Sequence, residues 1–262
     1  MEPNPVAQEL LVTDEDGVRI LTLNRPANLN ALCDTLMGAL ADAVADAARQ
    51  TSVACVVLTG SGRAFCAGGD VKGQARQVTV TAEEGGRIEQ SAARLQRFFE
   101  APRLLHEMSK PTIAMINGPV AGAGIGLAGA CDLRFAAQSA DFVSAFERIG
   151  ASGDFGATWF WTKILGTGAA RALFLLGEKL SAQEALAQGI YTRVYADEKL
   201  REETLGIARR LADGPRMGWR YLKANLNLAE DSAFETALER EALNMSLSTF
   251  ASAQIRRATQ PQ

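Results

Sequence analysis

The chain has 262 residues, 47% of them hydrophobic and 22% charged, and its formal net charge at pH 7 is −3. These values are typical of a globular protein, and the slight negative charge argues against a nucleic-acid-binding protein. Met1–Pro5 has neither the basic nor the apolar part of an export signal, so we expect a cytoplasmic protein. The four cysteines lack CxxC spacing, so we expect reduced thiols and no metal site.

The N-terminal part predicts a hairpin, a helix and a buried strand. Two strands, 9–13 and 18–24, flank the turn Asp14–Gly17. Asp34 is expected to cap an amphipathic helix that ends near Arg49. The apolar run 53–58 then predicts a strand buried on both faces.

A glycine-rich loop, Thr59–Lys72, follows that strand and contains Gly68, Gly69 and Asp70. Such a loop offers backbone donors at the edge of the sheet where open α/β proteins bind ligands. The alternative is an ordinary turn between a strand and a helix.

The next part of the chain is mostly polar. Residues 76–97, with two adjacent glycines, are predicted to be mobile. Pro102 is expected in the first turn of a helix that ends before Pro111. The apolar run 112–116 reads as a strand that leads into the second glycine-rich stretch.

That stretch, Asn117–Asp132, carries glycine at five positions and no ionisable side chain between Gly118 and Ala130. Any chemistry here must come from backbone N–H groups at a helix N-terminus. Three other interpretations were weighed: a helix packed tightly on its neighbours, a membrane span over 113–131, and a dinucleotide fingerprint at 124–129. Glycines and a proline disfavour the span, and the fingerprint lies too far behind its strand.

After about residue 155 the pattern is helical. Ser181 and Glu184 form a capping-box signature, and helical periodicity continues through 200–211, 214–228 and 234–247. The pattern as a whole predicts an α/β protein with an α-helical C-terminal part.

Taken together, these stretches resemble the crotonase superfamily, also called the enoyl-CoA hydratase/isomerase family. The matching pieces, in chain order, are 23–26, 29–31, 58–60, 65–70, 110–118, 122–124, 131–132, 139–142, 149–150, 180–185 and Gly189. The resemblance implies a spiral of ββα turns over 1–200, with C-terminal helices over 201–262 that help to form a homo-trimer or homo-hexamer. It also implies an acyl-CoA substrate, with no cofactor other than the CoA of that substrate, and neither nucleic acid nor membrane as partner.

The resemblance places an oxyanion hole for a thioester enolate at two backbone amides, those of Gly69 and Ala123. The residues expected along CoA are Ala67, Gly68, Asp70 and Lys72, with Arg25 as a further candidate near the CoA phosphates. For Lys72 and Arg25 the alternative is a solvated surface charge.

The departures from the family pattern bear on the reaction. Hydratases place two glutamates around a water, and the corresponding positions here are Gly126 and Phe146. Glu147 lies next to the second position, but a one-residue slip in an extended segment turns its side chain to the opposite face.

Asp154 remains as a candidate acid/base. In a glycine-rich turn before a helix, an aspartate is ordinarily an N-cap. The segment resembles the phenylacetate-pathway epoxyphenylacetyl-CoA isomerase branch of the superfamily, in which an aspartate moves a proton between carbons. Phe146, Phe155 and Trp159 are candidates for an apolar environment that raises its pKa.

The sequence therefore predicts an acyl-CoA isomerase with Asp154, Gly69 and Ala123 at the catalytic centre. The alternatives are an enoyl-CoA hydratase and a non-catalytic acyl-CoA-binding protein. A dehalogenase also resembles this segment, but it needs a tryptophan in place of Phe146 and a well-placed histidine. His106, the single histidine, is closer to Pro111 than that pattern expects, and it reads as a surface or helix-end residue.

Overall fold

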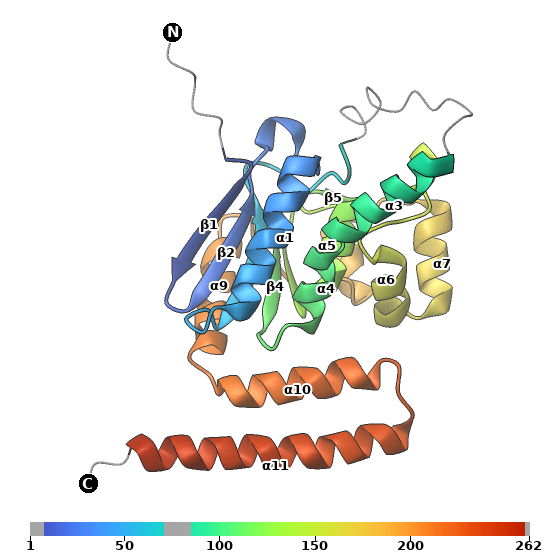
Figure 1. Ribbon diagram of the computed structural model, residues 1–262. Helices are drawn as coiled ribbons and strands as arrows, with labels where there is room; N and C mark the ends of the chain where they lie inside the picture. The colour runs from blue at the N-terminus through green and yellow to red at the C-terminus, as the bar shows by residue number, and fades with distance from the viewer. Residues whose placement is uncertain (1–7, 71–84, 260–262) are drawn as a thin grey trace.

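The computed structural model describes residues 8–70 and 85–259, and its strands form two ladders (Figure 1). The large sheet has the order β1-β2-β3-β4-β6-β8, and a second, two-stranded sheet pairs β5 with β7. Only β1 and β2 are antiparallel; the other pairs are parallel. The strands are β1 (Leu10–Glu15), β2 (Val18–Leu23), β3 (Cys55–Gly60), β4 (Thr112–Ile116), β5 (Val120–Ala121), β6 (Leu133–Ala137), β7 (Phe142–Val143) and β8 (Arg193–Tyr195).

The two ladders grow together along the chain. Each of the strands β2, β3, β4 and β6 of the large sheet is followed by a short extended segment. These segments pair with one another beside the large sheet and form the second ladder. The pairs that join these segments are Leu32–Gly69, Cys66–Val120, Val120–Phe142 and Phe142–Leu180. This repeated pattern is the ββα spiral that the family resemblance predicts, and the prediction of an α/β fold is confirmed.

Helices fill the connections and cover the sheet. The α-helices with described bounds are α1 (Asp34–Arg49), α3 (Gly85–Phe98), α4 (Glu100–Glu107), α5 (Ala123–Ala130), α6 (Ala157–Leu165), α7 (Thr167–Leu176), α8 (Ala182–Ala187), α9 (Leu200–Ala212), α10 (Arg216–Ala229) and α11 (Phe234–Thr259). Two short 3-10 helices are η1 (Pro26–Asn28) and η2 (Glu147–Ile149). In the described part of the chain no helix is both long and apolar enough to cross a membrane.

Several predicted elements agree closely with the structure. The strand 112–116 is β4, the predicted hairpin is β1–β2 with its turn narrowed to Asp16–Gly17, and both of these turn residues have positive φ. The capping box at Ser181 and Glu184 is present, with both hydrogen bonds formed. The stretch 113–131, weighed above as a membrane span, is divided among β4, β5 and α5.

One local prediction was wrong. Asp34 does not cap α1: Cys33 is the N-cap residue, no side chain caps the helix, and Asp34 pairs with Arg94 instead. The mobility predicted for 76–97 stays a prediction. Its residues from Gly85 onward form α3, which Arg94 joins to α1, while 76–84 lies outside the described residues.

The helical hairpin α10–α11 runs across one end of the core (Figure 1), and a buried lysine fastens it there. Lys223, on α10, is 6% exposed. Its Nζ donates to the carbonyls of Leu105 (2.9 Å) and Lys110 (3.2 Å) and to Oδ2 of Asp132 (2.9 Å). The same carboxylate oxygen accepts hydrogen bonds from N and Oγ1 of Thr112, so one ion pair joins α10, α4 and β4.

We expect Asp132→Ala to lower the free energy of unfolding by about 3 kcal/mol, because it leaves the buried Lys223 charge unpaired. Chemical denaturation at fixed protein concentration measures the loss. The control is Glu202→Ala, which removes the exposed pair with Lys199 and should change stability little. Equal effects of the two substitutions would contradict this account of the α10 attachment.

Candidate active site

The two glycine-rich stretches lie against each other beside the second ladder. A Cβ built on Gly68 would lie 3.1 Å from O of Ala121 and 3.3 Å from N of Ala123. This close approach explains why a residue without a side chain follows Ala67. It brings the amides of Gly69 and Ala123 into one region.

The amide of Gly69 is free because of the way the loop pairs with Leu32. Leu32 N donates to O of Gly68 (2.8 Å), and Asp70 N donates to O of Leu32 (3.0 Å). In a parallel bridge of this kind the bonds go to the residues on either side of the paired one. Gly69 N therefore points away from Leu32, and it donates to no acceptor in the described part of the chain. A Cβ on Gly69 would meet no described atom within 4 Å, so this side of the loop is open.

The amide of Ala123 is free for a different reason. Ala123 is the first residue of α5, and the first amides of a helix have no partner within it. The amide before it, Gly122 N, donates to O of Ser144, and Ile125 N donates back to O of Gly122. Among the described residues nothing accepts from Ala123 N. The helix dipole adds positive potential at this amide.

Asp154 lies next to the same helix. A Cβ on Gly126, one turn after Ala123, would be 3.1 Å from O of Asp154. Oδ1 of Asp154 is buried and has no hydrogen-bond partner in the described residues. Burial raises the pKa of Asp154 from 3.8 to about 6. The Asp154 carboxylate also acts on the loop that carries Gly68 and Gly69: burial raises the pKa of Cys66 to about 12, and the charge of Asp154 is a further cause of the rise.

The structure argues against the capping role for Asp154. The N-cap of α6 is Gly156, and no side chain makes a cap hydrogen bond there. Only the main-chain oxygen of Asp154 takes part, accepting from Ala157 N at 2.9 Å. A carboxyl whose Oδ1 is buried without a partner in the described residues, and whose pKa is raised, is more typical of a functional group than of a helix cap.

The aromatic residues predicted around Asp154 divide into two groups. Phe155 is 1% exposed, and its ring meets Phe99 edge-on at 5.3 Å. Phe146 is also buried and stacks on Phe174. Trp159 instead lies 38% exposed on α6, against the rings of His106 and Phe160. Phe99 is a neighbour that the sequence analysis did not identify, because its position in a polar segment gave no signal.

Glu147 and His106 are held in structural contacts. Glu147 Oε2 accepts from Ser144 Oγ, and Oε1 pairs with Arg148. Burial alone would raise the pKa of Glu147, but these hydrogen bonds bring it below its usual value. His106 lies in the last turn of α4, with Nε2 3.3 Å from Oε2 of Glu230, which agrees with the helix-end interpretation.

The residues expected along CoA remain predictions. Ala67 is exposed, and Gly68 is buried between the loops. Arg25 is engaged by Glu9 (3.2 Å) and Asp70 (2.9 Å) and donates to the carbonyl of Ala31, so it braces the loop that carries Gly69. Lys72 lies outside the described residues.

Comparisons with known proteins identify the family of the chain. The family model described as enoyl-CoA hydratase/isomerase matches residues 13–261. A 1,2-epoxyphenylacetyl-CoA isomerase from Escherichia coli K12 is 38% identical over 87% of this chain and 85% of its own. A crotonyl-CoA hydratase from Syntrophomonas wolfei is 30% identical over 90% and 87%. The solved enoyl-CoA hydratase of Mycobacterium smegmatis superposes with a TM-score of 0.82 at 28% identity, over 97% of this chain and 98% of that one.

The burial of Asp154 predicts a specific dependence of stability on pH. Between pH 3.8 and about 6 the folded chain holds a proton that the unfolded chain has lost, so stability falls as the pH rises through this window. Asp154→Asn removes the penalty. The variant should melt at a higher temperature than the wild type at pH 8 and at the same temperature at pH 4, as measured by thermal melts across this range.

Glu147→Gln serves as the control, because the pKa of Glu147 is shifted in the other direction. At pH 8, Glu147→Gln should therefore lower the melting temperature, whereas Asp154→Asn should raise it. An Asp154→Asn variant that melts at the wild-type temperature at pH 8 would instead favour the capping role, because asparagine caps a helix about as well as aspartate.

Proposed function

Since the chain belongs to the enoyl-CoA hydratase/isomerase family, we propose that it is an acyl-CoA isomerase that moves a proton between carbons of a CoA thioester. The observation that carries the proposal is the half-buried carboxyl of Asp154 beside α5, whose Oδ1 is buried and has no hydrogen-bond partner among the described residues. The first amide of α5 likewise has no acceptor among those residues. Enoyl-CoA or ring-modified acyl-CoA esters are the proposed substrates. The name of the Escherichia coli relative supports the second class.

In the proposed mechanism, the amides of Gly69 and Ala123 donate to the thioester oxygen as it becomes negative. One such donor contributes about 10²–10³ in rate. The Asp154 carboxylate removes a proton from one carbon, and the enolate forms. The resulting carboxylic acid then returns the proton to another carbon of the same substrate. A pKa of about 6 suits both steps, because the group is mostly ionised at neutral pH and is still a useful base.

Water addition is disfavoured by the same residues. Gly126 has no side chain, and Phe146 presents a ring that stacks on Phe174, so neither can hold or activate a water. Glu147 is committed to Ser144 and Arg148. Enoyl-CoA hydratase remains the second candidate, favoured by the names of relatives such as the Syntrophomonas wolfei enzyme. A non-catalytic acyl-CoA-binding protein is the third.

The residues proposed to line CoA are Ala67, Gly68, Asp70 and Lys72. For Arg25 we now favour an indirect role, in which its bond to Asp70 keeps the loop in place. No cofactor beyond the CoA of the substrate is proposed.

The wild-type protein should isomerise Δ3-enoyl-CoA or aromatic-ring-derived CoA esters and hydrate crotonyl-CoA poorly. Asp154→Asn should lose about 10²–10⁴-fold in isomerase rate while it stays folded, because it removes the only base proposed for the reaction. A panel of CoA esters assayed with both proteins measures this. Hydration that equals or exceeds isomerisation in the wild type would exclude the isomerase proposal.

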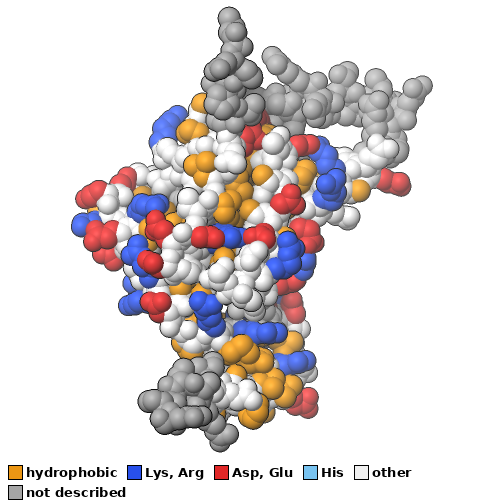
Figure 2. Space-filling model, turned by 60° about the vertical axis from the view of Figure 1, so that its left-hand side comes forward, with side chains coloured by type: hydrophobic (Ala, Val, Ile, Leu, Met, Phe, Trp, Pro, Cys, Tyr) orange, Lys and Arg blue, Asp and Glu red, His pale blue; other side chains and the backbone are white. Residues whose placement is uncertain are grey.

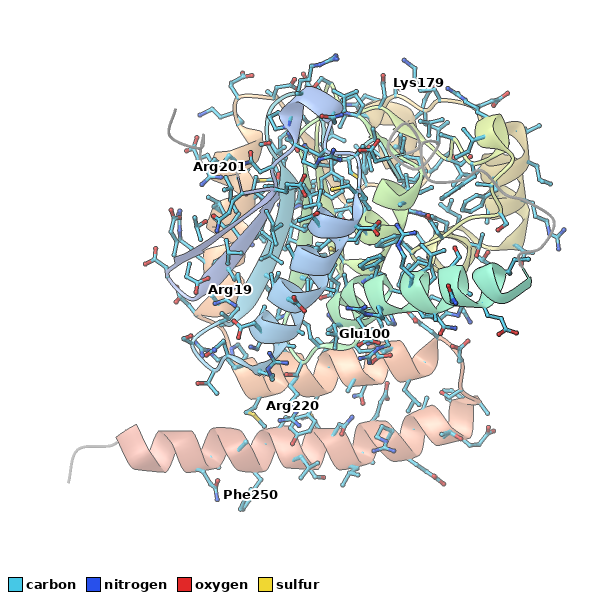
Figure 3. All side chains as sticks on the ribbon, turned by 45° about the horizontal axis from the view of Figure 1, so that its top comes forward. Arg19, Glu100, Lys179, Arg201, Arg220 and Phe250 are labelled. Atoms are coloured by element: carbon cyan, nitrogen blue, oxygen red, sulfur yellow. The ribbon has the colours of Figure 1, made fainter. Side chains whose placement is uncertain are left out.

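We also propose that the chain forms a homo-trimer or homo-hexamer through its C-terminal helices. Figure 2 shows hydrophobic side chains gathered at the end of the molecule where α10 and α11 lie, and Phe250 projects from α11 away from the core (Figure 3). The large apolar side chains described as exposed on the two helices are Leu222, Leu226, Phe234, Leu238, Leu243, Met245, Leu247 and Phe250. An apolar area of this extent is typical of an interaction surface.

Light scattering should therefore report a closed oligomer. The double variant Leu243→Lys and Phe250→Lys should shift it toward smaller species, because it places charges on the proposed interface. Leu175→Lys is the control: it changes an apolar residue near the end of α7 that is more exposed than Leu243 and Phe250, and it should leave the mass unchanged. A monomeric wild type would contradict the proposal.

A further inference from the structure

The absence of a side chain at Gly126 has a steric consequence as well as a chemical one. A Cβ built there would lie 2.7 Å from O of Phe155, 2.8 Å from Cβ of Phe155 and 3.1 Å from O of Asp154. The first two distances are shorter than Cβ contacts in real proteins, and the nearest atom belongs to the backbone. The main chain of Asp154 and Phe155 thus occupies the space into which any side chain at 126 would extend.

Phe155 is held against α5 in a strained conformation. Its φ is +48°, a left-handed value that a bulky side chain rarely adopts and that strains the backbone. The strain persists because the ring is buried and packs edge-on against Phe99. Two contacts therefore fix the orientation of Asp154. One is the contact of the 154–155 backbone with α5 at Gly126, and the other is the packing of the Phe155 ring on Phe99.

We propose that Gly126 is a positioning residue and the specificity-determining position of this chain, because its missing side chain admits the Asp154–Phe155 backbone and so aims the Asp154 carboxyl. The proposal rests on the acid/base role of Asp154 proposed above. It makes two carboxylate positions mutually exclusive. In this chain, a glutamate at position 126 and the present place of the Asp154–Phe155 backbone against α5 exclude each other.

The chemical consequence is a choice of substrate class. With Asp154 in this position and nothing at 126 to hold water, the site suits a thioester that only needs a proton moved. A thioester whose double bond must accept water needs the other arrangement. Gly126→Glu should therefore not turn the protein into a hydratase, because the new side chain must displace the Asp154 loop before it can reach the substrate.

The main experiment compares Gly126→Ala with Gly129→Ala. Both substitutions add one methyl to the same helix, and both meet α6 or the turn before it: a Cβ at Gly129 would lie 2.9 Å from Cβ of Phe160. Helix propensity and crowding are thus matched, and only position 126 touches Asp154. Steady-state kinetics with an isomerase substrate are measured for the wild type and both variants across pH 4–9.

For Gly126→Ala we expect kcat to fall by about 10²-fold with KM within about twofold, because a displacement near 1 Å misaligns the base while CoA still binds. The acidic midpoint of kcat should move below that of the wild type, since the displaced carboxyl is less buried. Gly129→Ala should keep the wild-type midpoint and most of kcat. A merely structural role for Gly126 would lower stability in both variants and leave both midpoints in place.

The outcomes separate this inference from the proposed function. Wild-type kcat and midpoint in Gly126→Ala, with an inactive Asp154→Asn, would overturn the role of Gly126 and leave that of Asp154. A fully active Asp154→Asn would overturn the proposed function itself. Gain of crotonyl-CoA hydration by Gly126→Glu with isomerase activity retained would also refute the mutual exclusion.

Should Gly126→Ala fail to fold, Phe155→Leu tests the same positioning of Asp154 through the contact of the Phe155 ring with Phe99. It keeps much of the buried volume and removes the ring contact with Phe99. A lower kcat and a lower acidic midpoint support the inference, whereas wild-type values of both contradict it.

Discussion

The parallel pairing of Leu32 with Gly69 is the constraint on which the proposed site depends. It uses the carbonyl of Gly68 and the amide of Asp70, and for that reason it leaves the amide of Gly69 unbonded on the open side of the loop. The second ladder then brings Cys66 beside Val120, two residues before the turn into α5. The free first amide of that helix follows from helix geometry alone. Two donors are thus made available by backbone pairing, with no polar side chain required.

The proposed acid/base group has a cost that the rest of the chain must offset. Oδ1 of Asp154 is buried without a partner in the described residues, and Phe155 beside it adopts a strained φ. Both features destabilise the folded chain, and both are maintained by packing against α5 and Phe99. Destabilising groups that persist in this way are common at functional sites, where activity and stability favour different residues. The ion pair between the buried Lys223 and Asp132, which lies just after the end of α5, has the contrasting role of a hydrogen-bonded structural contact.

Much of the fold was predictable from local patterns, while the details of the site were not. The apolar run 112–116 gave β4 without error, because a strand buried on both faces is apolar throughout. The cap at Asp34 was wrong because its carboxylate pairs with Arg94, which is distant in sequence. For Asp154, sequence alone could not separate a cap from a base, since both favour an aspartate before a glycine turn. Burial and the absence of a described partner distinguish them, and these are tertiary properties. The contact between Gly126 and the 154–155 backbone likewise depends on how α5 and the turn before α6 pack.

In the proposed mechanism the carboxyl of Asp154 alone performs the proton transfer, with the amides of Gly69 and Ala123 as backbone donors. The pH dependence of kcat/KM for an isomerase substrate tests it most directly, because this quantity reports the groups that titrate in the free enzyme. The account predicts a single rise with a midpoint near the Asp154 pKa of about 6, followed by a plateau with no second limb up to pH 9. A midpoint near 4, or a bell-shaped profile that requires a second titrating group, would contradict it.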